Sequence, residues 1–233
     1  MKKITSLILA AAMIFVCLTA LTACGEKMGE GACEYLETRD TAGRDIRYVE
    51  ICVKNYGKMV IMLDATTAPK TVENFVNLAN SGFYNGLTFH RIIDGFMIQG
   101  GDPDANGSGG SEKEIYGEFS SNGHQNDISH KRGVISMARS DDENSASSQF
   151  FICHEDASSS LDGNYAAFGY VVEGMSVVDD IVKTTMDKCM QYYGNNFYYW
   201  LYYGNGSLTD GREPIRELQP KIKYVKVLDS WEK

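Results

Sequence analysis

The chain has 233 residues with 22 basic and 31 acidic side chains, so its formal net charge is −9. Hydrophobic residues make up 43% and charged residues 23%, which is typical of a globular protein and excludes the disordered and fibrous classes. The acidic balance argues against nucleic-acid binding, because phosphate recognition needs a clustered positive surface. The length suits one domain of about 200 residues, or at most two small ones.

The first 23 residues are typical of an export signal. Lys2 and Lys3 precede an apolar, uncharged run from Ile4 to Ala23, and a short cationic start before an apolar core marks secretion. Residues 21–25 read Leu-Thr-Ala-Cys-Gly. This resembles the lipobox of bacterial lipoproteins, in which the cysteine is lipidated and the signal is cut just before it. The alternative is a plain transmembrane anchor of about 20 residues.

We therefore expect a lipid on Cys24 to anchor the chain to the extracytoplasmic face of the cell membrane. Removal of the signal leaves 20 basic and 31 acidic side chains, a formal −11. Acyl chains then hold the membrane without a polybasic patch. Residues 24–44 show no clear periodicity and are predicted to be a tether, with one folded domain over 45–233.

Cysteine usage leaves the disulfide pattern open. The cysteines that remain after signal removal and lipidation are Cys33, Cys52, Cys153 and Cys189. An exported chain permits disulfides, but four cysteines have three possible full pairings and the sequence does not choose among them. No Cys-x-x-Cys or His-rich spacing is present, so no metal is expected.

The body begins with a predicted hairpin and helix. Alternating apolar residues over 47–53 and 58–63 flank an Asn-Tyr-Gly turn, which predicts a β-hairpin. Apolar residues then fall at helical spacing within 66–79. Pro69 near the start of this run and Gly82 after its end are typical helix boundaries.

Most of the remaining predicted elements are short strands. The pattern predicts one further helix over 175–182 and strands at 88–93, 97–99, 134–138, 149–153, 167–172 and 221–228. Many short strands with few helices favour a β-barrel or a sandwich.

Two familiar kinds of site are disfavoured. Residues 102–107 fit the start of an EF-hand loop, but the position that needs a bidentate Glu holds Lys113, so glycine-rich close packing is the better interpretation of 102–110. The sequence contains no Gly-x-Ser-x-Gly elbow, so no serine nucleophile is placed for a catalytic histidine. We therefore expect the histidines at 90, 124, 130 and 154 to be structural. Cys153 lies in an apolar strand, which indicates an inert thiol.

An arginine among apolar residues indicates a pocket instead. Residues 89–102 read Phe-His-Arg-Ile-Ile-Asp-Gly-Phe-Met-Ile-Gln-Gly-Gly-Asp, and a hairpin there can bring Arg91, Phe96, Met97 and Gln99 to one face. A second run over 147–152, Ser-Ser-Gln-Phe-Phe-Ile, combines amide and aromatic side chains. Each apolar residue taken singly is explained as core. An arginine in a barrel core is costly unless it is paired or functional, and therefore the combination predicts a pocket.

These segments are similar to the cyclophilin family of peptidyl-prolyl cis-trans isomerases. The matching stretches are 68–79, 89–102, 106–110, 115–118, 133–139, 148–153 and 161–174, followed by the last strand. The resemblance implies a mainly β fold, an eight-stranded antiparallel β-barrel capped by two helices, with the active groove on its outer face. We expect a monomer that needs no cofactor and acts on proline-containing polypeptides.

Catalysis of X–Pro isomerisation requires a fixed hydrogen-bond donor. An X–Pro bond rotates over a barrier of roughly 18–20 kcal/mol, and a donor aimed at the proline nitrogen beside a dry pocket favours the twisted state. The resemblance assigns catalysis to Arg91, Phe96 and Gln99, with Arg91 as the donor. It assigns substrate binding to Met97, Gly107, Ala138, Arg139, Ser140, Gln149, Phe151, Leu161 and Tyr165.

The sequence departs from the family pattern at single positions. Ser160 stands where animal-type members carry a Trp, which makes tight cyclosporin binding doubtful. Tyr165 replaces a common His, and Arg139 replaces a common Asn. Tyr can still donate a hydrogen bond.

The larger departure is an insertion over about 184–219. Eight of the 26 aromatic residues of the chain lie between Tyr192 and Tyr203. One interpretation is an extra element packed on the barrel. The other is an exposed Tyr/Trp surface for a polypeptide or a cell-wall sugar, and on that view deletion of 192–206 spares the turnover of small peptides.

The sequence therefore predicts an extracytoplasmic isomerase that assists the folding of exported proteins, a role that fits the slowness of uncatalysed proline isomerisation. The alternative is a catalytically weak, cyclophilin-like module that binds proline-containing polypeptides. The intact set around Arg91 argues against this alternative, and turnover of a short X–Pro peptide separates the two.

Overall fold

The computed structural model describes residues 41, 43–210 and 213–231. The predicted export signal, the lipidation site Cys24, Cys33 and most of the predicted tether lie outside these residues. Among the helices in the described part of the chain there is none whose length and apolar character would carry it across a bilayer.

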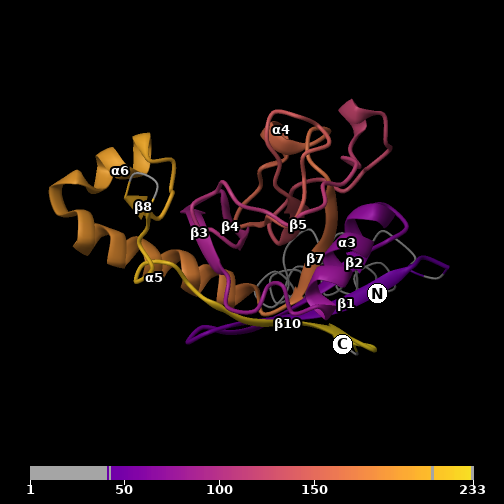
Figure 1. Ribbon diagram of the computed structural model, residues 1–233, viewed down its shortest axis with the longest axis horizontal. Helices are drawn as coiled ribbons and strands as arrows, with labels where there is room; N and C mark the ends of the chain where they lie inside the picture. Colours follow the sequence, from indigo (N-terminus) through magenta and orange to yellow (C-terminus); the bar gives the residue numbers. More distant parts are fainter. Residues whose placement is uncertain (1–40, 42, 211–212, 232–233) are drawn as a thin grey trace, which may run out of the picture.

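The core of the fold is one curled antiparallel sheet, in the order β10-β1-β2-β7-β5-β6-β4-β3. Its strands are β1 (Ile46–Val53), β2 (Gly57–Asp64), β3 (Thr88–Ile93), β4 (Met97–Asp102), β5 (Val134–Met137), β6 (Phe150–Cys153), β7 (Ala167–Glu173) and β10 (Ile222–Leu228). A bridge between Thr88 and Lys221 joins the two edge strands, so the sheet curls into the barrel of Figure 1. The expected eight-stranded antiparallel fold is confirmed, and β4 runs three residues beyond its predicted end.

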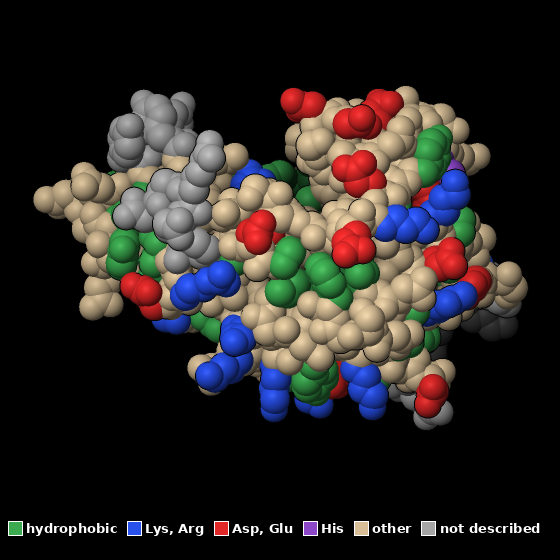
Figure 2. All heavy atoms as spheres, in the orientation of Figure 1, with side chains coloured by type: hydrophobic (Ala, Val, Ile, Leu, Met, Phe, Trp, Pro, Cys, Tyr) green, Lys and Arg blue, Asp and Glu red, His purple; other side chains and the backbone are tan. Residues whose placement is uncertain are grey.

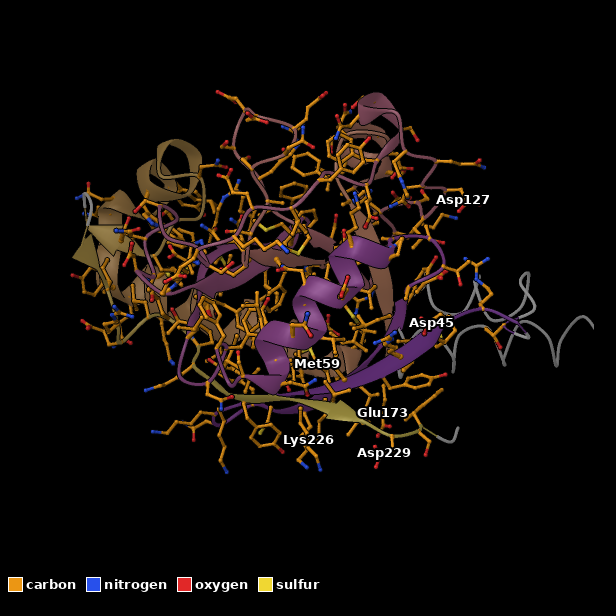
Figure 3. The ribbon with its side chains drawn as sticks, turned by 45° about the vertical axis from the view of Figure 1, so that its right-hand side comes forward. Asp45, Met59, Asp127, Glu173, Lys226 and Asp229 are labelled. Atoms are coloured by element: carbon orange, nitrogen blue, oxygen red, sulfur yellow. The ribbon has the colours of Figure 1, made fainter. Side chains whose placement is uncertain are left out.

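Helix α3 (Pro69–Asn80) covers one end of the barrel, where it packs against β10 and β2. Figure 3 shows it lying across the sheet, with Lys226 and Asp229 on the opposite, outer side of β10. Its N-cap residue Ala68 offers no side-chain oxygen. The buried carboxylate of Glu118 replaces the cap, because it accepts the N–H groups of Lys70 (3.1 Å) and Thr71 (2.9 Å).

Helix α5 (Met175–Tyr193) is longer than predicted. The prediction of an end at residue 182 was wrong because the buried stripe of the helix continues through Thr185 and Cys189. Polar residues between these two positions hide the stripe from a local pattern search. The extension carries the chain beyond the barrel, where the insertion begins (Figure 1).

The insertion folds back against β3 as a small lobe. It contains η2 (Gly194–Asn196), α6 (Phe197–Tyr203), β8 (Thr209–Asp210) and β9 (Glu213–Pro214). Phe197 and Trp200 join the hydrophobic core, whereas Tyr198 is 76% exposed and Tyr192 51% exposed. The packed interpretation therefore holds for the inner face of the lobe, and two described tyrosines remain on its surface.

Alternation along the strands divides the apolar residues between two faces of the sheet. Ile98, Phe150 and Ile152 point into the barrel, where they join the main core. Met97, Phe151 and Cys153 lie in a second cluster that includes Leu161 of the short helix α4 (Ser158–Leu161). The period of two along a strand thus builds an apolar surface outside the barrel.

Candidate active site

Strand register aligns three predicted site residues across the sheet. Arg91 of β3 pairs with Gln99 of β4, and Gln99 pairs with Phe151 of β6. β3 has one extra residue, His90, between the pairs formed by Phe89 and Arg91. A bulge of this kind re-aims the side chains that follow it, and here it places Arg91 beside Gln99.

The Arg91 guanidinium is held by two neutral oxygen atoms. Its Nη1 donates to Oε1 of Gln99 at 3.2 Å, and its Nε donates to the main-chain carbonyl of Asn205 at 2.9 Å. Within the described residues, no carboxylate forms an ion pair with Arg91, and its Nη2 makes no hydrogen bond. Burial lowers the pKa of this guanidinium from its ordinary value, but an arginine stays charged in proteins. The site therefore presents a fixed cation with a free donor.

A chain of amides links Arg91 to the loop that follows β4. Gln99 Nε2 donates to Gln149 at 2.9 Å, and Gln149 Nε2 donates to the carbonyls of Gly107 (3.0 Å) and Gly109 (2.8 Å). These bonds fix which end of each amide faces its neighbour. Gln99 therefore turns its carbonyl oxygen toward Arg91.

The loop itself is closed by Asp102, whose carboxylate accepts the N–H groups of Asp104 (2.8 Å), Asn106 (3.0 Å) and Gly107 (2.6 Å). A Cβ atom on Gly109 would lie 2.2 Å from that carboxylate. The expected glycine-rich close packing of this loop is therefore confirmed.

An apolar pocket lies beside Arg91, in a hollow of about 260 Å³. Met97, Phe151 and Leu161 form its buried part, with 1%, 4% and 7% of their surface exposed. Phe96 and Tyr165 are half-buried at its rim, and the Tyr165 ring meets Phe151 edge-on at 5.9 Å. Figure 2 shows this face hollowed between the lobe of the insertion and the lobe that carries α4.

A buried histidine supports the floor of the pocket. His130 stacks on Phe151 at a centroid distance of 6.0 Å, and its ring nitrogens contact Asp162 (2.8 Å) and Ser136 (3.0 Å). Although the order resembles a Ser-His-Asp triad, Ser136 is completely buried. It cannot attack a substrate, and His130 is structural, as expected.

A second hollow of about 480 Å³ adjoins the pocket, and Gln149, Ser140 and Gly107 are among its lining residues. Arg139 walls both hollows. Its guanidinium lies 4.9 Å from the centre of the Tyr165 ring and donates to the carbonyls of Asn164 (3.0 Å) and Ser140 (2.8 Å). Arg139 therefore ties together two loops that border the groove. A larger hollow, of about 790 Å³, lies along α3 and residues 111–116, away from Arg91.

The structure brings all twelve predicted catalytic and substrate-binding residues to these two adjoining hollows. Their individual roles stay a prediction. Ser160 is exposed and does not line the pocket. Three further residues, His90, Asn106 and Ser207, line the pocket without having been predicted. His90 and Asn106 adjoin predicted residues in the chain, whereas nothing in the local sequence indicates Ser207.

The described cysteines Cys52, Cys153 and Cys189 are free thiols. Burial raises the pKa of Cys153 far above its ordinary value and that of Cys189 to about 12. The expectation that the Cys153 thiol is inert agrees with this burial.

Comparison with known proteins identifies the family. Residues 48–195 match the family described as cyclophilin type peptidyl-prolyl cis-trans isomerase/CLD. A peptidyl-prolyl cis-trans isomerase of Helicobacter pylori is 45% identical over 129 residues, which cover 54% of this chain and 76% of the relative. Peptidyl-prolyl cis-trans isomerase A of Dickeya dadantii is 41% identical over 140 residues, covering 58% and 72%. A cyclophilin type isomerase of Cryptosporidium parvum, crystallised in the presence of the dipeptide Ala-Pro, superposes with a TM-score of 0.57 at 28% identity, covering 78% of this chain and 99% of its own.

Proposed function

Because the chain belongs to the cyclophilin-type peptidyl-prolyl cis-trans isomerases, we propose that Arg91 and the apolar pocket beside it carry out its isomerase reaction. The observation that carries this proposal is the state of Arg91. It is a partly buried cation held by two neutral oxygens, and its Nη2 makes no hydrogen bond to the described residues. A cation kept in this arrangement is suited to binding a group on a substrate.

The reaction needs no covalent step. Rotation about an X–Pro bond removes amide resonance, and the proline nitrogen gains a lone pair as the bond twists. The Nη2–H group of Arg91 donates to that lone pair, which is available in the twisted state and not in the planar ground states. A contact of this kind lowers the barrier because it is stronger in the transition state than in either isomer.

The pocket places the proline ring next to this donor. Met97, Phe151 and Leu161 bury the ring and exclude water, which strengthens the hydrogen bond to the nitrogen. Gln99 orients Arg91 through the hydrogen bond at Nη1. The adjoining hollow, with Gln149 and the backbone of 138–140, holds the residues before proline.

Substitution of Arg91 tests the assignment. Arg91→Ala lowers kcat/KM for a short X–Pro peptide by about 10²–10³, the usual effect of removing one donor that stabilises a transition state. Arg47→Ala is the matched control, because Arg47 lies exposed on β1, outside the groove, where it pairs with Asp45. Activity is measured with a protease-coupled assay. Retained activity in Arg91→Ala, with an unchanged melting temperature, contradicts the role of Arg91. An inactive wild-type chain that still binds the peptide favours the binding-module alternative.

We also propose that the protein acts outside the cytoplasm, tethered by lipid on Cys24, and assists the folding of exported polypeptides. The support is the sequence alone, in which an apolar run with a cationic start ends at Ala23-Cys24. Mass spectrometry of the mature N-terminus is expected to find a chain that begins at Cys24 and carries the lipid, and Cys24→Ser is expected to abolish both the lipid and the cut after Ala23. A mature chain that begins elsewhere, or one that begins at Cys24 without lipid, contradicts the proposal.

A further inference from the structure

We propose that residues 204–208 of the insertion form part of the catalytic groove, and that the main-chain carbonyl of Asn205 positions Arg91 for its reaction. The family match ends at residue 195, so this positioning element lies in the part of the chain that the match does not cover. The inference rests on the proposed role of Arg91. The NMR measurement of the Arg91 Nε–H, described last, does not depend on isomerase activity.

The segment pairs with the outer edge of β3, which is otherwise the last strand of the sheet. Ile92 N–H donates to the carbonyl of Gly206 at 2.9 Å, and Leu208 N–H donates to the carbonyl of His90 at 2.7 Å. Arg91 and Ser207 face each other as an antiparallel bridge. The insertion thus satisfies the free polar groups of an edge strand, and it does so at the residues on either side of Arg91.

This pairing brings the Asn205 carbonyl to the Arg91 Nε atom, at 2.9 Å. Gln99 holds Nη1 from β4, on one side of β3, and Asn205 holds Nε from the insertion, on the other side. The guanidinium is therefore fixed from both sides of the strand that carries it. Arginine has a long side chain with many rotamers, and a donor that is already oriented needs no reorganisation during the reaction. The contacts at Nε and Nη1 leave Nη2 without a hydrogen bond to the described residues, in a side chain that lines the groove together with Ser207.

The segment is itself firmly held. The indole Nε1 of Trp200 donates to the Ser207 carbonyl at 2.7 Å, and Trp200 is 94% buried, with its ring stacked on Tyr193 at 5.0 Å. The buried amide of Gln219 donates to the carbonyls of Leu208 (2.8 Å) and Ala105 (2.9 Å). These contacts tie the segment to α6, to α5 and to the loop after β4, and Figure 1 shows α6 and β8 beside β3.

A substitution at Gly206 is expected to separate residues 204–208 from β3. Its φ is +69°, and a Cβ atom there would lie 2.5 Å from the carbonyl oxygen of Ile92 and 2.5 Å from Cγ1 of Ile93. Gly206→Ala therefore pushes 204–208 off the strand. Gly194 is the matched control because it lies in the same insertion with φ +51°, and a Cβ there meets nothing within 4 Å. Gly194→Ala thus adds a Cβ atom at a second positive-φ glycine of the insertion where it meets no neighbour, so the segment keeps its place.

The kinetic arm measures kcat and KM on a short X–Pro peptide. We expect Gly206→Ala to lower kcat by about tenfold, the value of one hydrogen bond to a charged group, with KM changed less than twofold. Gly194→Ala stays within twofold of the wild type. In an Arg91→Ala background, Gly206→Ala lowers the remaining activity less than twofold, because the segment acts through Arg91. Equal activities of the two glycine variants, or an equal tenfold loss without Arg91, overturn the proposal.

The spectroscopic arm follows the Arg91 Nε–H signal by ¹⁵N NMR. We expect slow exchange with water in the wild type and in Gly194→Ala, and fast exchange in Gly206→Ala. Fast exchange in the folded wild type overturns the proposal whatever the activity. If Gly206→Ala does not fold, Trp200→Phe replaces it, since this change removes the indole donor to Ser207 and keeps an aromatic ring. Trp200→Phe is expected to lower kcat about threefold and to speed the exchange of the Nε–H, and wild-type values of both contradict the proposal.

Discussion

His90 makes a specific contribution to the pH dependence of stability. The residue is 98% buried beside the groove, and neither ring nitrogen has a hydrogen-bond partner among the described residues. Burial lowers the pKa of His90 to about 4, against attraction by the Asp102 carboxylate and with a smaller lowering by the Arg91 cation. His90→Leu removes the titrating ring at nearly constant volume.

The direction in which pH changes the free energy of unfolding follows from which state of the chain binds a proton on His90. Between pH 6.5 and 4 the unfolded chain carries a proton on His90 that the folded chain does not, so the free energy of unfolding falls as the pH falls through this range. With these two pKa values the loss amounts to about 2 kcal/mol between pH 7 and 5, and about 3 kcal/mol by pH 4. At pH 7 we expect His90→Leu to be as stable as the wild type or more stable, because it removes two polar atoms without partners.

The assay is urea unfolding of both proteins at several pH values from 7 to 4, read by fluorescence. Carboxylates that titrate near pH 4 are present in both chains, and so is His130, whose pKa is also lowered by burial. The difference between the two curves therefore isolates His90. We expect the wild type to lose about 2 kcal/mol more than the variant between pH 7 and 5. Parallel curves would refute the account of a buried, neutral His90.

The remaining predictions concern the helix cap and the insertion. Glu118→Ala is expected to lower the free energy of unfolding by about 3 kcal/mol, because it removes the acceptor of the part-buried Lys70 N–H and of the buried Thr71 N–H at the start of α3. The control Glu112→Ala changes an exposed residue and, in the same denaturant titration, should change the free energy of unfolding by less than about 0.5 kcal/mol. Deletion of 192–206 is expected to lower both the melting temperature and small-peptide turnover, because the deletion removes buried Phe197 and Trp200 together with the carbonyl on Arg91. Full turnover with weaker binding of an unfolded protein would instead favour the exposed aromatic surface.

The sequence alone left open whether the insertion is a packed element or an exposed surface whose deletion spares turnover. Tyr192–Tyr203 reads as an aromatic surface because eight aromatic residues lie in a run of twelve. Aromatic composition does not say which ring faces inward. The fold buries Phe197 and Trp200 and leaves Tyr192 and Tyr198 exposed, and this division depends on where α5 delivers the chain.

The sequence by itself determined the hairpin of β1 and β2, helix α3, the succession of short strands and the residues of the groove. These features are local, since a period of two along β4 and β6 is enough to place Met97, Gln99 and Phe151 on one outer face. The run at 89–102 holds much of the site in fourteen consecutive residues, so a family resemblance could identify it.

Only the tertiary structure decided what holds these residues in place. Asn205 contacts Arg91 across 114 positions of the chain, and Glu118 caps α3 from 47 positions beyond Thr71. The burial of His90 depends on segments that are distant in the sequence, among them the loop with Gly107 and the strand with Asp102. Periodicity reports how a residue sits within its own helix or strand. A contact between distant positions depends instead on the path of the whole chain, which no local pattern in this sequence encodes.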